Sequence, residues 1–231
     1  MTATVGRRLL VPALSTLVML AVLLGLGTWQ VRRLAWKRDL LARIDTAERA
    51  AAVPLPADPD PFQKVAVRGR LLTDRSALYG AEVHDAPAGP VLGGQLIMPL
   101  ERAGAPPVLV DLGWVPAVRR APLDLPAGET VIDGYVRPPE RPGWFSATDN
   151  PGARLFYTLD PPAIGAALGL PAVAPFTLVA MGPTPPRGWP APATSLPRPP
   201  NNHLQYAITW YGLAVTLLVV FVVYVRKGSG A

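Results

Sequence analysis

The sequence predicts a membrane protein of the α+β class, in which two transmembrane helices flank a mostly antiparallel β domain with one short helix. Uncharged apolar runs stand near both ends of the 231-residue chain, and short alternating segments separated by turn residues lie between them. Half of the residues are hydrophobic and the mean hydropathy is +0.26, as expected for a membrane-anchored chain. This length leaves room for one domain of moderate size outside the membrane.

The first predicted transmembrane helix covers residues 9–31 and follows Arg7-Arg8. It is long enough to span a hydrocarbon core about 30 Å thick. A secretory signal peptide also starts with basic and apolar residues, but its apolar core is shorter and ends in small residues. This segment ends in Gly27-Thr28-Trp29-Gln30, which favours an uncleaved anchor. Helical spacing continues to about residue 52, where Pro54 stops the pattern.

The second predicted transmembrane helix covers residues 203–225, which contain no Asp, Glu, Lys or Arg. Pro199-Pro200 prevents an earlier start, because proline clashes with the preceding turn and lacks an N–H. Asn202 is then the expected N-cap, with Gln205 three residues later in the capping-box position. From Leu204 to Val225 such a helix would span about 33 Å, enough to cross the bilayer.

Basic residues predict the orientation of the chain in the membrane. Arg7-Arg8 and Arg226-Lys227 place both termini in the cytoplasm under the positive-inside rule. The basic cluster at residues 32–38 argues for the opposite orientation. It precedes a stretch of roughly 165 residues, however, and long domains cross the membrane largely regardless of charge. We therefore expect both termini inside and the central domain outside.

The central part of the chain predicts a β domain between two linkers. Proline-rich linkers are expected at residues 53–61 and 181–200, and the β-rich domain at residues 62–180. Alternating patterns predict strands at residues 63–72, 77–82, 92–100, 107–115, 130–137, 154–159 and 176–180. This spacing suggests an antiparallel barrel or sandwich.

A short helix is expected after Leu159. Asp160 is a suitable N-cap, Pro161 suits the first helical position, and Gly169 follows the end of the pattern. No other helix is predicted within the β domain.

Composition excludes several functional classes. The absence of cysteine rules out disulfides, zinc–thiolate sites and covalent c-type haem attachment, and four scattered methionines disfavour copper delivery. Much of the net charge of +6 lies beside the membrane segments, where anionic lipid is a simpler partner than nucleic acid. Of the two histidines, His84 is predicted to lie in a solvated loop. No nucleophile elbow, phosphate-binding loop or paired acid suggests an enzyme.

Aromatic and basic side chains gather where the two helices meet the membrane surface. His203, Tyr206 and Trp210 share one helix face, since they stand at i, i+3 and i+7. Trp29 and Trp36 are also seven residues apart. An interfacial aromatic belt explains such residues singly. A histidine at this position is still a functional candidate, because an ionisable group in a membrane costs several kcal/mol unless it is partnered.

Two end motifs resemble those of a known family. The first is Gly27-Thr28-Trp29-Gln30-Val31-Arg32-Arg33-Leu34-Ala35-Trp36-Lys37, which matches G-x-W-Q-x-x-R-x-x-W-K. The second is Asn201-Asn202-His203-Leu204-Gln205-Tyr206-Ala207-Ile208-Thr209-Trp210, which matches N-N-H-x-x-Y-A-x-T-W. Both resemble the surfeit locus protein 1 family of cytochrome c oxidase assembly factors. Where the family pattern reads V-N-R-G-W-V-P, this chain has Val110-Asp111-Leu112-Gly113-Trp114-Val115-Pro116, which removes any contact made by the arginine.

The resemblance implies a non-enzymatic role in the maturation of haem-copper oxidases, with haem a received and passed to the catalytic subunit. It implies His203 as the haem-iron ligand and metal-site residue, with Gln30 in the same site. Aromatic packing on haem would come from Trp29, Tyr206 and Trp210, and Arg32 and Arg33 would meet the propionates. The implied partners are the oxidase catalytic subunit, haem a synthase and the lipid bilayer of the bacterial plasma membrane.

Two other classes of function fit the residues. A haem-independent scaffold would use the same tryptophans and arginines to hold oxidase assembly intermediates. A membrane-tethered enzyme would need a pocket in the β domain with a perturbed acid or base, which the sequence does not display. The assembly factor linked to haem ranks first, the scaffold second and the enzyme third.

Overall fold

A computed structural model describes residues 2–86, 89–118, 122–183, 185 and 188–228. The chain divides into two units, Ile44–Pro197 and the combination of Met1–Arg43 with Arg198–Ala231. The elements, in chain order, are α1 (Thr2–Arg49), β1 (Val53–Pro54), β2 (Lys64–Leu71), β3 (Ala77–Ala86), β4 (Gly89–Arg102), β5 (Ala105–Pro116), β6 (Glu129–Arg137), η1 (Pro151–Ala153), β7 (Leu155–Phe156), α2 (Pro161–Ala167), β8 (Thr177–Ala180) and α3 (His203–Gly228).

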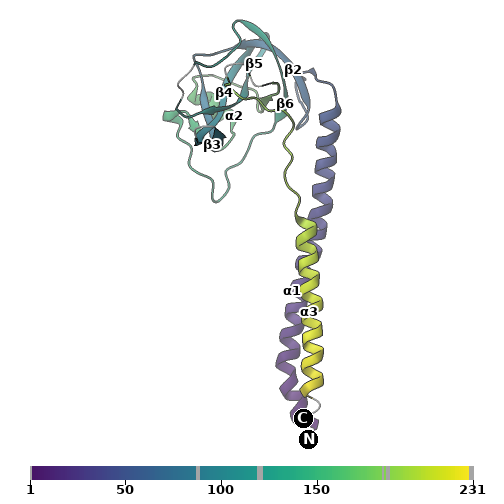
Figure 1. Ribbon diagram of the computed structural model, residues 1–231. Helices are drawn as coiled ribbons and strands as arrows, with labels where there is room; N and C mark the ends of the chain where they lie inside the picture. Colours follow the sequence, from purple (N-terminus) through teal and green to yellow (C-terminus); the bar gives the residue numbers. More distant parts are fainter. Residues whose placement is uncertain (1, 87–88, 119–121, 184, 186–187, 229–231) are drawn as a thin grey trace. The chain divides into compact units, whose positions relative to one another are not determined.

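The two terminal helices, α1 and α3, lie side by side and antiparallel (Figure 1). Leu9–Arg49 and His203–Lys227 are long and apolar enough to cross a membrane, by length and composition. On α1 the buried residues of this unit stand three or four positions apart, at Leu23, Gly27, Gln30 and Leu34. On α3 they are Ala207 and Ala214, seven positions apart. Each helix thus presents one narrow face to the other.

The strands of the β domain close into a barrel. Within the described residues, β2 pairs with β6, β6 with β8, β8 with β5 and β5 with β4, and β4 returns to β2. Most neighbours are antiparallel, while β5–β8, β1–β2 and β3–β7 are parallel. Closure of the ring leaves β2, β4, β5, β6 and β8 paired on both sides.

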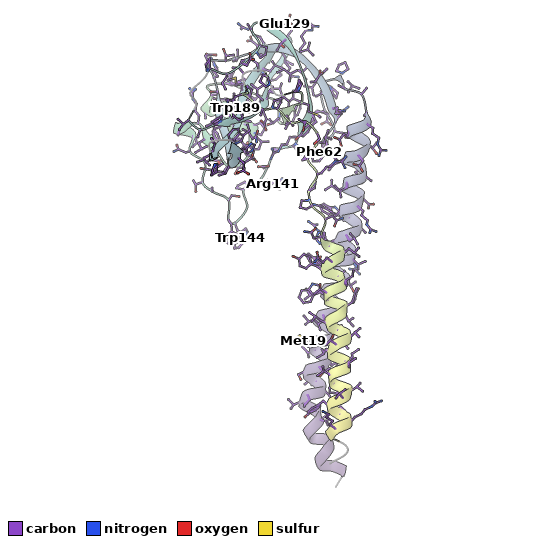
Figure 2. The ribbon with its side chains drawn as sticks, viewed as in Figure 1. Met19, Phe62, Glu129, Arg141, Trp144 and Trp189 are labelled. Atoms are coloured by element: carbon purple, nitrogen blue, oxygen red, sulfur yellow. The ribbon has the colours of Figure 1, made fainter. Side chains whose placement is uncertain are left out.

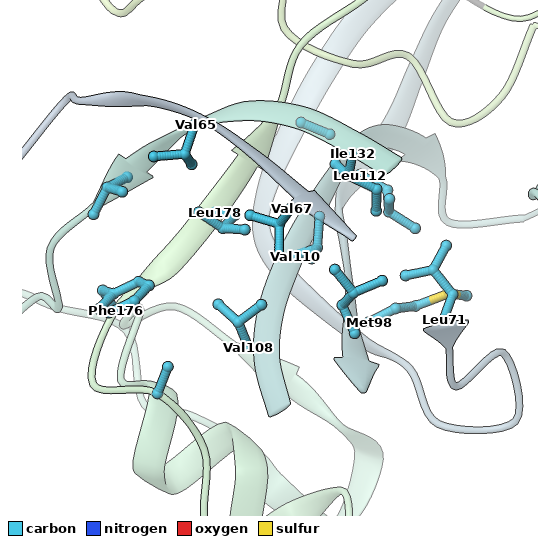
Figure 3. Packing of buried hydrophobic residues seen from close by; sticks show 14 of the residues in the cluster. Val65, Val67, Leu71, Met98, Val108, Val110, Leu112, Ile132, Phe176 and Leu178 are labelled. Atoms are coloured by element: carbon cyan, nitrogen blue, oxygen red, sulfur yellow. The ribbon is translucent and has the colours of Figure 1, made fainter. Parts of the chain in front are cut away.

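Side chains alternate between the inside and the outside of the barrel, because successive residues of a strand point to opposite faces. Inward-facing apolar residues fill the interior (Figure 3), among them Val65, Val67, Leu96, Met98, Val108, Val110, Leu112, Ile132, Val136 and Leu178. A fully buried aliphatic side chain contributes about 1.5–3 kcal/mol, so this cluster dominates the stability of the domain.

A second apolar cluster lies on the outer face of the barrel. Leu109 and Ile97 point outward from β5 and β4, and they pack with Phe156 of β7 and Ile164 of α2. Helix α2 begins as the sequence predicts: the side chain of Asp160 accepts a hydrogen bond from the Ala163 N–H. Helix α2 and β7 therefore cover the part of the outer face around Ile97 and Leu109. They do not cover the part around Asp111 and Gly113.

The predicted strands are present, with β7 reduced to two residues. The placement of His84 in a solvated loop was wrong, since β3 runs on to Ala86. A register shift between Tyr79 and Glu82 lets β3 continue pairing with β4, and the imidazole of His84 stacks on Trp114 with centroids 4.2 Å apart. The expectation failed because the polar residues of this strand alternate only weakly with apolar ones.

The proline-rich stretch before α3 packs on the barrel over part of its length. Trp114 and Ala191 exchange two backbone hydrogen bonds, each 3.0 Å long. The N–H of Ala193 donates to the carbonyl of Ala180, and Leu196 is 1% exposed. The region that the sequence predicts as linker thus contributes to the outer face at least as far as Leu196.

Replacement of Gly113 by alanine should destabilise the domain by about 3 kcal/mol, which lowers the melting temperature by roughly 10 °C. The φ angle of Gly113 is +112°, and an added Cβ would lie 2.0 Å from the carbonyl oxygen of Ala191. Thermal melting of the full chain in detergent micelles, followed by circular dichroism, measures the shift. Gly128→Ala is the matched control, because Gly128 has a φ of +78° but open space around its Cβ position. It should cost about 1 kcal/mol. Equal shifts for the two variants would contradict the tight contact at Gly113.

Candidate functional site

The paired helices hold His203 in one tautomer. Nδ1 of His203 lies 2.7 Å from Oε1 of Gln30. A carboxamide oxygen can only accept a hydrogen bond, so Nδ1 donates and carries the ring proton. The lone pair of the neutral imidazole is therefore on Nε2. Gln30 is 8% exposed and lies on the face of α1 that meets α3, whereas His203 is partly exposed.

Local sequence places these two side chains opposite each other. Helix α3 begins at His203, and the N–H of Tyr206 donates to the carbonyl of Asn202, which stands in the predicted N-cap position. Small residues let the helices approach closely. Gly27 is the clearest case, since a Cβ there would lie 2.8 Å from the ring of Tyr211. The hydroxyls of Thr28 and Tyr211 also meet across the helix pair, at 3.2 Å.

Of the aromatic side chains predicted for the site, Trp29 contacts the imidazole of His203. The ring of Trp29 stands edge-on to that of His203, with centroids 6.4 Å apart and an interplanar angle of 85°. Trp29 and Tyr206 are about half exposed, and Trp210 is partly exposed. The structure thus brings Trp29, Gln30 and His203 together. Tyr206 and Trp210 share the same helix but do not pack on the imidazole ring.

The two arginines of the predicted site differ in their surroundings. The guanidinium of Arg33 lies over the ring of Trp36, 4.0 Å from its centroid, which is a cation–π contact. Arg32 is exposed. Both side chains lie on α1 within one turn of Gln30, where a basic residue could meet an anionic group at the membrane surface.

This arrangement fits a haem ligand. A metal-binding histidine usually donates its second ring N–H to an acceptor, which fixes the tautomer and raises the basicity of the ligating nitrogen. Gln30 supplies that acceptor. Two residues before His203, Oδ1 of Asn201 is buried without a hydrogen-bond partner among the described residues, and such unsatisfied atoms are uncommon in folded proteins. Among the described residues, no group of three or more histidine, cysteine or acidic side chains could hold a metal ion instead.

Comparison with known proteins covers nearly the whole chain. The model of the SURF1 family matches residues 17–215. The chain belongs to the SURF1 family. This match confirms the family resemblance that the end motifs indicate. The family is known as one of cytochrome c oxidase assembly factors.

Similar proteins come from distant organisms. A SURF1-like protein of Monosiga brevicollis is 32% identical over 225 residues, which cover 90% of this chain and 85% of the relative. Surfeit locus protein 1 of Rattus norvegicus is 30% identical over 231 residues, which cover 91% of this chain and 74% of the relative. A SURF1-like protein of Rickettsia felis is 27% identical over 222 residues, with coverage of 93% and 96%.

The departure from the SURF1-family pattern in β5 has a structural explanation. Leu112 stands where the pattern has arginine, and its side chain is 7% exposed inside the barrel core. The neighbouring Asp111 points to the outer face. A buried aliphatic side chain therefore occupies the arginine position, and the charged residue of this chain lies on the opposite side of the strand.

Sequence reasoning missed a polar cavity on the outer face of the barrel. It has a volume of about 260 Å³ and is lined by residues of β3, β4, β5, β6 and β8 together with Ala191–Ala193. Asp111 lies in its wall and is 2% exposed. The N–H of Gly113 donates to Oδ1 of Asp111 at 3.0 Å. Burial raises the pKa of this carboxyl to about 6, against the smaller opposing effects of the Gly113 hydrogen bond and of Arg137.

A charged network borders the same cavity. Arg137 donates to Oε1 of Glu140 at 2.6 Å and to the hydroxyl of Tyr79 at 3.0 Å. Tyr79 donates to Glu140 in turn, and so does the N–H of Leu159. Burial raises the pKa of Tyr79 to about 12. Burial alone would raise the pKa of Glu140, but the hydrogen bonds from Leu159, Arg137 and Tyr79 outweigh it and lower that pKa. The charge of Arg137 is thus already paired.

The sequence does contain a signal for Asp111. It is an acidic residue within an otherwise apolar run at residues 108–115. An aspartate is rarely buried unless another group pairs with it, so its presence in a buried strand indicates a special environment. The cavity itself could not be foreseen, because its walls come from strands that are distant in the sequence.

Replacement of Gly27 by valine should weaken the pairing of α1 with α3. The added atoms would clash with the stiff ring of Tyr211 and break its hydrogen bond to Thr28, at a cost of about 1–3 kcal/mol. Gly25→Val is the matched control, since it makes the same change on the same helix where nothing lies within 4 Å. Thermal melting of the helical signal of the full chain in detergent should separate the variants, and equal melting temperatures would refute close packing at Gly27.

Replacement of Asp111 by asparagine should stabilise the β domain at neutral pH by up to about 3 kcal/mol. The pKa of Asp111 rises from 3.8 to about 6 on folding, so the folded state binds more protons between these values. Stability contributed by the protonated carboxyl is therefore lost as the pH rises through this window. Asparagine keeps the acceptor for Gly113 but cannot ionise, so that loss should disappear. Unfolding curves measured across the window test the difference, and parallel pH profiles for the two proteins would contradict it.

Proposed function

We propose that this SURF1-family chain assists the assembly of a haem-copper oxidase by binding haem a where α1 and α3 meet. His203 is the proposed axial ligand, and the haem is then inserted into the catalytic subunit. The observation that supports this proposal is the 2.7 Å hydrogen bond between Gln30 and His203, because it leaves Nε2 free to donate its lone pair.

Other residues of the site have supporting roles in this proposal. Trp29, Tyr206 and Trp210 offer aromatic surface to the macrocycle, and Arg32 and Arg33 offer cations to its propionates. Bound haem would supply an iron centre with an open coordination position for a histidine nitrogen. A single protein ligand suits a carrier, since it can bind firmly and still release its cargo.

The proposal includes partners and a location but no catalytic step. Haem a synthase would deliver the haem, and the oxidase catalytic subunit would receive it. The chain would cross the bacterial plasma membrane twice, with both termini in the cytoplasm and the β domain outside. Two apolar helices of sufficient length and the similarity to a Rickettsia protein support this location.

A haem-independent scaffold is the second candidate. Trp29 is 55% exposed and Trp36 is 48% exposed, and tryptophan and arginine are the residues that most often dominate protein interfaces. In this role the same surface would hold oxidase assembly intermediates together, and His203 would serve only to pair the helices.

Absorption spectra of the protein purified from cells that make haem a should separate these candidates. We expect a haem a spectrum for the unaltered chain and its loss in His203→Ala. Gln30→Leu keeps the ligand but removes the acceptor of Nδ1–H, so affinity should fall by about 10- to 100-fold.

Gln205→Leu is the matched control for this experiment. It makes the same chemical change on an exposed position of α3, two residues from His203, and should leave the spectrum unchanged. A haem signal that survives His203→Ala would reject His203 as the ligand. A colourless protein that still co-purifies with the oxidase would favour the scaffold.

A further inference from the structure

We propose that the cavity on the outer face of the barrel binds a cationic nitrogen group, an ammonium or a guanidinium, between the carboxylates of Asp111 and Glu82. This site is separate from His203 and does not depend on haem binding. Both carboxylates line the cavity, which is formed by the uncovered end of the outer face and the segment Ala191–Ala193.

Asp111 is the residue that points to a ligand. Its side chain is 2% exposed, and its hydrogen-bond partner among the described residues is the Gly113 N–H two positions away, which contacts Oδ1. No described group pairs with Oδ2. A buried carboxylate normally has a cation or several donors as partners, because removal of its hydration is costly. A cation in the cavity would provide the missing partner.

Glu82 forms the outer part of the proposed site. Nε2 of Gln95 donates to its Oε2 at 3.1 Å, and Nε2 of His84 lies 3.4 Å from the same oxygen. The side chains of Glu82 and His84 are 50% and 46% exposed. The carboxylate is thus held in position at the edge of the cavity, where a ligand from solvent would meet it first.

Among the residues that the structure describes, the other charged groups leave the cavity negative. Arg137 is paired with Glu140 at 2.6 Å, so the two cancel. Tyr79 and Tyr135 stay neutral, since burial raises the pKa of each to about 12. With Asp111 ionised, the described groups Asp111, Glu82, Glu140 and Arg137 carry a net negative charge, although Arg137 still attracts the Asp111 carboxylate. An anionic ligand would meet this negative charge, whereas a cation would neutralise it.

Size and donor set narrow the class of ligand. The volume of about 260 Å³ is below the 300–1,000 Å³ of ordinary small-molecule sites, which suits a single side chain or a small amine rather than a large cofactor. Within the described residues no cluster of three metal-binding side chains occurs here, so a nitrogen cation fits better than a metal ion. The ligand could be a free amine or a lysine or arginine of a partner protein.

Titration of the full chain in lipid nanodiscs with methylguanidinium tests the proposal. Isotope labelling of the tryptophans makes each indole N–H visible by NMR, and Trp114 lines the cavity. We expect its signal to move saturably. Trp144 is 100% exposed on the loop between β6 and η1 (Figure 2), so its signal is the internal control and should not move.

Asp111→Asn should weaken methylguanidinium binding at least tenfold while it leaves the fold intact, since asparagine keeps the hydrogen bond from Gly113. Glu82→Gln is a second variant expected to weaken binding. Glu101→Gln is the matched control, because Glu101 pairs with Arg70 and does not line the cavity. His203→Ala should also leave the affinity unchanged, which keeps this test independent of haem binding.

Several outcomes would overturn the proposal. They are the absence of a saturable shift at Trp114, an affinity unaffected by Asp111→Asn, and a stronger response to acetate than to methylguanidinium. A short peptide with a central arginine distinguishes the two sources of the cation. Tighter binding of the peptide would support a partner side chain, and weaker binding would support a free small amine.

Discussion

The close approach of α1 and α3 is the constraint on which the candidate site depends. Gly27 has no room for a side chain against Tyr211, and Ala207 is buried on the facing helix. At this separation Gln30 reaches His203 and fixes its tautomer. A larger residue at Gly27 would therefore act on the chemistry of His203 without touching it. Helix packing, which brings Gln30 to His203, therefore fixes the tautomer and the orientation of the imidazole.

Closure of the barrel governs the second unit in a similar way. Because each strand of the ring has one inward and one outward face, the apolar interior and the outer cavity use alternate residues of the same strands. Leu178 fills the core from β8, and the adjacent Val179 lines the cavity. The ring strands β4, β5, β6 and β8 that line the cavity all carry core residues as well. Only the segment Ala191–Ala193 belongs to no long strand.

Much of the architecture follows from local patterns. Uncharged runs and the break at Pro199-Pro200 indicate the terminal helices, and period-two alternation locates the strands. Asp160 predicts the start of α2 because capping is a local interaction. Pairing between distant strands leaves no such local signal, so neither the parallel β5–β8 contact nor the packing of Ala191 on Trp114 could be read from the sequence. His203 was identified by its position at a helix start, whereas its partner Gln30 was known only through a family motif.

Asp111 and Leu112 are adjacent departures from the SURF1-family pattern, and they lie on opposite faces of β5. Leu112 replaces an arginine and adds apolar volume to the barrel interior, while Asp111 replaces an asparagine and adds negative charge to the outer cavity. Because consecutive residues face opposite sides, neither change compensates the other. Both end motifs, which hold Gln30 and His203, are intact. The electrostatics of the cavity can therefore differ between relatives that share the same histidine site, so a ligand of the cavity would be specific to chains with an acid at this position.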